Sequence, residues 1–165
     1  MKGLIRRIAC ALFQVLSDKP TTPLEPEPVS NYELISRDDF LAICEKAHIY
    51  PISLQTPLDS KLSIVHKSQL DRLAPWLTFS ASLYVADIVD CEDYGIEAQS
   101  KAAFKYHVSG KRLALGDMPL GYHGFAMTID RNRAIWLLEP NAGFEFAGQW
   151  VKLGENGYGP DKVFV

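Results

Sequence analysis

Two stretches of alternating side chains, separated by a short polar run, constrain the fold of this chain more than any other feature. From His123 to Ile129, and again from Ile135 to Glu139, the residues alternate in character at every second position. The run Asp130–Arg133 between them carries turn-forming polar residues. A period of two is the side-chain period of a β-strand. The pattern therefore predicts a β-hairpin over residues 123–139.

The length of the hairpin loop decides which side chains share a face. A three-residue loop, Asp130–Asn132, makes His123 and Glu139 direct neighbours across the two strands, and Asn132 tolerates the left-handed conformation that such a loop requires. A loop with an even number of residues would place the two side chains on opposite faces. We favour the odd loop because it also gathers the apolar residues of both strands on one face: Phe125, Met127, Ile129, Ile135 and Leu137.

A helix with one face of mostly small residues is predicted from Asp90 to about His107. Helical spacing brings Cys91, Gly95, Ala98, Ala102 and Tyr106 to the same side. A face of this kind lets a helix approach a neighbouring sheet closely. It also places Cys91 in the first turn.

The remaining patterns complete one α+β domain over residues 31–165. Ser36 is the expected N-cap of a helix that ends near His48. A short helix is predicted at 67–73, before Pro75, whereas the stretch 76–85 is compatible with a strand or with irregular chain. Residues 149–153 and 163–165 can add strands. We expect the helix that begins near residue 91 to pack on an antiparallel sheet containing the hairpin.

We interpret the first thirty residues as a segment separate from the α+β domain. Residues 1–18 contain an amphipathic helix, with an apolar stripe over residues 3–17, and residues 19–30 form a proline-rich linker. A secretory signal and a helix that packs on its own domain are alternatives. We favour a helix that docks on a protein partner or an interface, because the apolar part is short and contains Gln14.

Charge and cysteine content limit the classes of partner. A formal net charge of −3 gives no general attraction to nucleic acid, and no apolar run reaches the length of a transmembrane helix. Three widely spaced cysteines, Cys10, Cys44 and Cys91, make neither a disulfide framework nor a metal knuckle. A reducing compartment is therefore expected in preference to secretion.

Cysteine at a helix start, histidine on a strand and a carboxylate on the next strand together form the arrangement of a thiol nucleophile. The positive end of the helix dipole favours the thiolate of Cys91. The imidazole of His123 accepts the thiol proton, and Glu139 orients the ring. The acidic residues Asp90, Glu92 and Asp93 disfavour the thiolate. We interpret them as charges suited to a helix start or, alternatively, as metal ligands. The sequence alone does not show whether the helix dipole or the acidic neighbours dominate at the Cys91 thiol.

The same three places resemble the motif blocks of a known family. Asp90-Cys-Glu-Asp-Tyr94, Gly121-Tyr-His-Gly-Phe125 and Trp136-Leu-Leu-Glu-Pro140 are similar to the blocks of the fungal agglutinin C-terminal domain, which has a papain-like cysteine-peptidase fold and also occurs in lectin-like bacteriophage proteins. The resemblance covers about residues 84–140. The family usually has asparagine where Ala126 stands in this chain.

This resemblance implies a site and two classes of function. It makes Cys91 the nucleophile, His123 the base and Glu139 the orienting acid, with calcium held by Asp90, Glu92 or Asp93. One class is a cysteine peptidase or amidase that acts on peptide or cell-wall amide bonds and requires no cofactor. The other is a non-catalytic, lectin-like structural or attachment module of a phage particle, docked through its N-terminal helix. Both imply a location in the host cytoplasm or on a virion.

Overall fold

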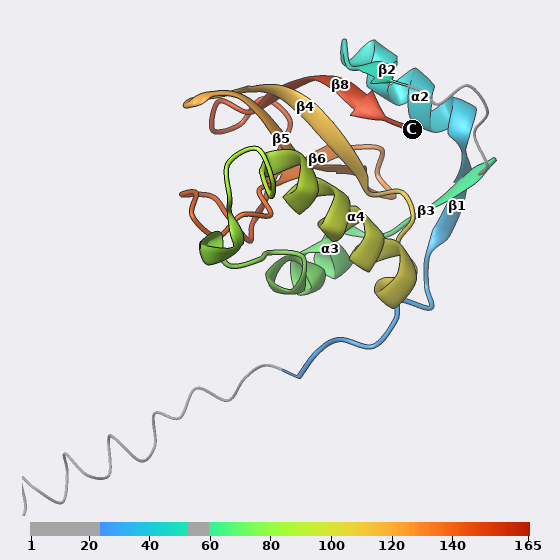
Figure 1. Cartoon of the computed structure of the whole chain (residues 1–165). Helices are drawn as coiled ribbons and strands as arrows, with labels where there is room; N and C mark the ends of the chain where they lie inside the picture. The colour runs from blue at the N-terminus through green and yellow to red at the C-terminus, as the bar shows by residue number, and fades with distance from the viewer. Residues whose placement is uncertain (1–23, 53–59) are drawn as a thin grey trace, which may run out of the picture.

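The computed structural model describes residues 24–52 and 60–165 (Figure 1). The predicted N-terminal helix and the first part of the predicted linker lie outside these residues. The described chain has the expected α+β architecture, with two sheets and three α-helices. None of the described helices is long and apolar enough to cross a membrane.

The larger sheet is mixed, whereas the sequence predicted an antiparallel one. Its strands lie in the order β2 (Tyr50–Ile52), β8 (Gly159–Phe164), β4 (Arg112–Met118), β5 (Gly121–Ile129), β6 (Ile135–Leu138) and β7 (Trp150–Lys152). All neighbours are antiparallel except β2 and β8, which run parallel. A second, antiparallel sheet pairs β1 (Glu33–Ser36) with β3 (Lys61–Ile64). The predicted strands near the C-terminus correspond to β7 and β8.

The helices begin where their capping residues stand. Helix α2 (Arg37–Lys46) follows Ser36, whose side chain accepts a hydrogen bond of 3.0 Å from the backbone of Asp39. Helix α3 (Lys67–Leu73) matches its predicted bounds and continues as a 3-10 turn over Ala74–Trp76. Helix α4 (Cys91–Tyr106) ends at His107 in the left-handed conformation. The ambiguous stretch after Trp76 holds a 3-10 turn at Ala81–Leu83 and no named strand.

The hairpin has the predicted parity but a different register. Ile129 pairs with Ile135, so the loop has five residues, Asp130–Ala134, in place of three. The side chain of Asp130 accepts hydrogen bonds from the backbone of Asn132 and Ala134 and thereby closes the longer loop. The left-handed residue is Arg133 and not Asn132. Glu139 therefore lies beyond the end of β6 and is not the direct cross-strand neighbour of His123.

The core has two parts, divided by the two faces of β5. The odd-numbered residues Phe125, Met127 and Ile129 belong to the part that also holds the apolar side chains of α2. Ala126 belongs to the part built around α3 and α4. Figure 1 shows α4 lying across the strands β4 and β5. The predicted small-residue face of α4 is its buried face, apart from Cys91, which is partly exposed.

Contacts of the chain before β1 extend the body beyond the predicted boundary at residue 31. Residues 24–30 have no regular secondary structure. Glu25 nevertheless accepts hydrogen bonds from Lys105 and Tyr106 at the end of α4, each at 2.6 Å. Val29 is buried, and its backbone N–H donates to the Tyr106 carbonyl at 3.1 Å. The second half of the predicted linker is thus held against the domain.

Candidate functional site

Cys91 is placed by the first turn of α4 and by a glycine on the strand beneath it. Asp90 caps the helix, and its backbone N–H donates to the Asp93 carboxylate at 3.1 Å. A Cβ atom at Gly124 would lie 3.3 Å from the carbonyl carbon of Cys91 and from the backbone nitrogen of Glu92. Because Gly124 has no side chain, the start of α4 can rest on β5 next to His123. Ala126, which stands where the resembled family has asparagine, lies in the core against α4. It therefore does not alter the contact between Gly124 and the start of α4.

His123 and Glu139 form a buried pair. The ring nitrogen Nε2 lies 2.9 Å from the Glu139 carboxylate oxygen Oε2. The other oxygen, Oε1, accepts the backbone N–H of Asn141 at 2.9 Å. Only 9% of His123 and 2% of Glu139 is exposed, and the ring of Phe144 packs on the imidazole with a centroid distance of 4.8 Å. A buried carboxylate with both oxygens bonded holds the ring in one orientation.

The pair changes the charge of the ring. Burial alone would lower the pKa of His123, but hydrogen bonding and charge from the Cys91 sulfur and the Glu139 carboxylate outweigh it and raise that pKa to about 9. The imidazolium form is therefore favoured at neutral pH. Since Nε2 bonds to Glu139, Nδ1 is the ring nitrogen left for the sulfur of Cys91.

The thiol itself is held by a neighbouring acid in this conformation. The sulfur Sγ of Cys91 donates to the Glu92 carboxylate at 3.0 Å. This hydrogen bond, together with one from Asp90, lowers the pKa of Glu92. The same sulfur also forms the hydrogen bond that raises the pKa of His123, so transfer of the thiol proton moves it from the Glu92 side of the sulfur to the ring.

A cleft of about 470 Å³ opens over Cys91 and His123, so the cysteine is not sealed in the core. The other residues that line it were not predicted from the sequence as site residues: Ala81, Tyr84, Tyr122, Asn141, Gly143 and Phe144. Asn141 carries a signal that could have been used. It stands two residues after Glu139 and so shares its side of the extended chain. Its Oδ1 accepts the Gly143 backbone N–H at 2.9 Å, which leaves its amide nitrogen for the cleft.

The acidic residues do not fit a calcium site. Ligand atoms of Asp90, Cys91 and Glu92 lie within 4.8 Å of one another. They supply two carboxylates and a sulfur, whereas calcium takes six to eight oxygen ligands. The Asp93 carboxylate, the third expected ligand, instead accepts the Asp90 backbone N–H. Their place at the start of α4 matches the alternative role of helix-start charges.

The other three histidines lie apart from the cleft. His48 follows the end of α2 and His107 caps α4, both in the left-handed conformation. His66 is the N-cap residue of α3. The structure thus brings His123 and Glu139 into contact and places Cys91 beside His123, as the motif blocks predicted. Whether the three residues catalyse a reaction stays a prediction.

Comparison with solved structures identifies fungal lectins with a similar fold. A complex of PSL1a with E64 matches with a TM-score of 0.58 and 12% sequence identity over 80% of this chain and 51% of that chain. The Polyporus squamosus lectin bound to the human-type influenza-binding epitope Neu5Acα2-6Galβ1-4GlcNAc matches with a TM-score of 0.52 and 12% identity, over 80% of this chain and 49% of that chain. This chain thus spans about half the length of either neighbour.

At this level of identity the likeness shows the fold alone. No protein-family model matches the sequence, and the search of curated proteins finds no match. The comparisons therefore support an α+β fold like that of these solved structures. The expected papain-like classification and the expected place in a phage particle remain predictions.

Proposed function

We propose that this domain is a cysteine-dependent hydrolase of peptide or other amide bonds, built on a lectin-like fold. The observation that carries the proposal is the 2.9 Å hydrogen bond between His123 and Glu139, buried beneath the cleft that Cys91 lines. A buried carboxylate and imidazole cost stability unless they satisfy each other. Their meeting beside a partly exposed cysteine at a helix start supports a chemical role in preference to a packing role.

The residues have separate roles in the proposed reaction. The proton of the Cys91 thiol passes to Nδ1 of His123, which gives a thiolate beside the imidazolium. The thiolate then attacks the substrate carbonyl carbon, so that a C–S bond forms. The imidazolium then protonates the leaving amine as the C–N bond breaks, which leaves a thioester. Water, deprotonated by His123, attacks this thioester, releases the carboxylic acid and restores the thiol. Glu139 keeps the ring oriented and stabilises its charged form.

The developing oxyanion has two donors within the same cleft. One is the side-chain amide of Asn141, which the Gly143 backbone fixes through Oδ1. The other is the backbone N–H of Cys91 at the start of α4, where helix N–H groups are free. Loss of one such donor costs about 10²–10³ in kcat in known hydrolases.

Digestion of a mixed peptide library by the full chain, followed by mass spectrometry, tests this proposal. We expect new peptide termini with the unmodified chain and with the matched control Cys10→Ser, and none with Cys91→Ala or His123→Ala. Asn141→Ala should retain slow cleavage. Equal cleavage by Cys91→Ala, with normal folding of each variant, would refute the assignment of the nucleophile.

A second candidate function is a non-catalytic, glycan-binding module. It is favoured by the neighbour that was solved with a sialylated glycan. The matched region covers about half of that neighbour, so the glycan site can lie in either half. Titration of this chain with Neu5Acα2-6Galβ1-4GlcNAc tests the candidate: saturable binding that Cys91→Ala leaves unchanged would support a lectin. A partner bound through residues 3–17 remains a separate prediction.

A further inference from the structure

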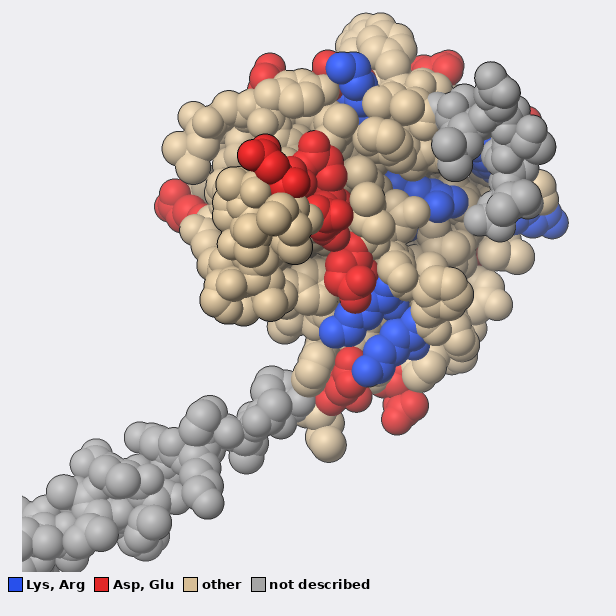
Figure 2. Space-filling view, viewed as in Figure 1, with Lys and Arg blue, Asp and Glu red and all other residues tan. Residues whose placement is uncertain are grey.

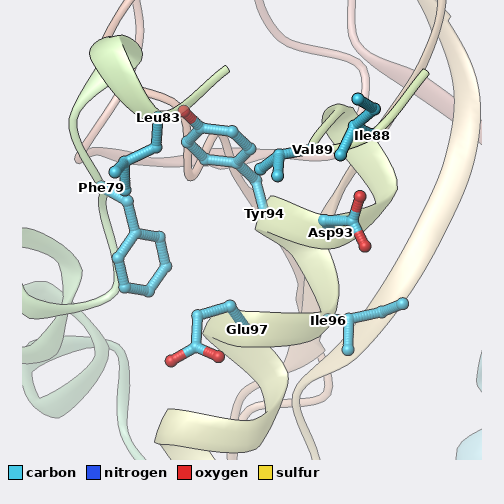
Figure 3. A pocket seen from close by; sticks show the side chains of 8 residues that line it. All are labelled: Phe79, Leu83, Ile88, Val89, Asp93, Tyr94, Ile96 and Glu97. Atoms are coloured by element: carbon cyan, nitrogen blue, oxygen red, sulfur yellow. The ribbon is translucent and has the colours of Figure 1, made fainter. Parts of the chain in front are cut away.

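A second pocket lies beside the candidate site, on the other side of the segment that precedes α4. It has a volume of about 310 Å³. Figure 3 shows Phe79, Leu83, Ile88 and Val89 projecting from this segment, with the Tyr94 ring between them and α4 below. Ile88 is 73% exposed, and Leu83 is 54% exposed. Exposed apolar side chains that gather around a hollow are typical of an interaction site.

The helix side of the pocket is acidic. Asp93 and Glu97 lie one turn apart on α4, and no lysine or arginine of residues 24–52 and 60–165 lines the pocket. The Asp93 carboxylate is already bonded to the Asp90 backbone, whereas the Glu97 carboxylate has no hydrogen-bond or ion-pair partner among the described residues. Figure 2 shows acidic side chains forming a band across the face of the molecule that carries α4. The pocket therefore combines apolar walls with an available carboxylate.

The pocket is within reach of a polypeptide bound at Cys91. Glu97 stands six residues after Cys91 on one helix, which corresponds to about 9 Å along the axis and about 120° around it. Two or three residues of an extended peptide, at about 3.3 Å each, span this distance. The segment before α4 also borders both hollows, with Ala81 and Tyr84 on the cleft and Leu83 and Val89 on the pocket.

The chemistry of the walls selects one class of side chain. Lysine and arginine bury an apolar stem while keeping a cationic end at a polar group, and a cation is attracted to an aromatic face. One ring of the pocket already has such a neighbour, because Nζ of Lys101 lies 5.6 Å from the centroid of Phe79. An acidic side chain would be repelled by Glu97, and a purely apolar one would leave this carboxylate unused.

We propose that this pocket receives an arginine or lysine side chain of the polypeptide bound at Cys91. That a polypeptide binds at Cys91 rests on the proposed function. The preference for a basic side chain rests on the apolar walls and the acidic charge of the pocket itself. Glu97 is the selecting residue. Lys101 competes for the same aromatic and acidic groups.

Binding can be measured without hydrolysis in the full chain carrying Cys91→Ala. The probes are end-blocked alanine pentapeptides whose central residue is arginine, leucine or glutamate, titrated by calorimetry or NMR. We expect the arginine peptide to bind more tightly than the leucine peptide, and the glutamate peptide to bind most weakly. Glu97→Gln should weaken binding of the arginine peptide about fivefold and leave the leucine peptide unchanged. The exposed Glu45 of α2 provides the matched control, Glu45→Gln.

The outcomes separate this inference from the proposed function. Glu97-dependent binding of the arginine peptide, in a chain that cleaves no peptide, would support the pocket and count against the hydrolase. Cleavage without preference for basic residues, unchanged by Glu97→Gln, would support the hydrolase and overturn the pocket. Equal affinity for the arginine and leucine peptides in the binding assay would also overturn it. Lys101→Gln should leave the arginine peptide bound equally or more tightly; weaker binding would contradict the assigned competition.

Discussion

The protonation of His123 is the most quantitative consequence of the site geometry. Its pKa, raised to about 9 from a reference of 6.5, corresponds to an interaction on the order of 3 kcal/mol in favour of the imidazolium. Burial opposes the imidazolium, so the interactions with Cys91 and Glu139 must supply this stabilisation. A hydrogen bond to a charged group contributes about 1.5–3 kcal/mol. The change Glu139→Gln should therefore lower the pKa of His123 to about 7–8.

Histidine ring protons observed by NMR between pH 5 and 10 give the assay. The chain has four histidines, and His123→Gln identifies the signal of interest by its loss. The raised folded-state pKa also affects stability. The imidazolium of the folded state contributes stability that is fully present below about pH 6.5 and is lost as the pH rises through about 9. Chemical denaturation should show this loss in the unmodified chain and much less of it in Glu139→Gln.

Two results would refute this reasoning. One is a His123 signal that titrates near 6.5 in the unmodified chain. The other is a high pKa that Glu139→Gln leaves unchanged, which would mean that the buried hydrogen bond does not control the ring. Either result would remove the physical basis for assigning the base.

Three further predictions concern the rest of the domain. Lys111 is buried, its Nζ has no hydrogen-bond partner among the described residues, and burial holds its pKa well below the usual range. Lys111→Met should raise the unfolding free energy by about 1–3 kcal/mol at pH 6 and by less at pH 10, where the unfolded lysine begins to lose its proton. Gly124→Ala should slow alkylation of Cys91 about threefold to tenfold, because the added Cβ displaces the start of α4. Gly159→Ala is the control and should leave the alkylation rate unchanged, because a Cβ there meets nothing within 4 Å. Deleting residues 1–23 should leave the melting temperature nearly unchanged, but deleting 1–28 should lower it, because the longer deletion removes side-chain hydrogen bonds to the end of α4. Equal melting temperatures for the two truncations would show that these bonds contribute nothing.

Local signals in the sequence predicted the helices well and the sheet only in part. Ser36 and Asp90 mark helix starts because capping depends on residues three apart in the chain. The hairpin register was wrong by two residues because Asp130 bonds two backbone N–H groups, a preference that alternation does not reveal. Strand β4 was missed, and the parallel pairing of β2 with β8 depends on contacts more than a hundred residues apart.

The candidate site shows the same division between local and non-local signals. His123 and Glu139 share a face because of strand parity, which the sequence expresses, and parity is preserved when the register shifts by two. The bond of the Cys91 thiol to Glu92 depends on side-chain rotamers and could not be predicted. Asn141 lies after the end of β6, where only its spacing of two residues from Glu139 indicates that it faces the cleft.

The rate at which iodoacetamide alkylates Cys91 at pH 7 tests the central claim most directly. The buried Cys44 is an internal reference, because burial and the nearby charge of Glu45 raise its pKa to about 12; Cys10→Ser removes the third thiol. The account predicts fast, stoichiometric labelling of Cys91 that His123→Ala slows by at least tenfold, with Cys44 unlabelled. Labelling of Cys91 at the rate of an ordinary exposed thiol, unchanged by His123→Ala, would contradict it.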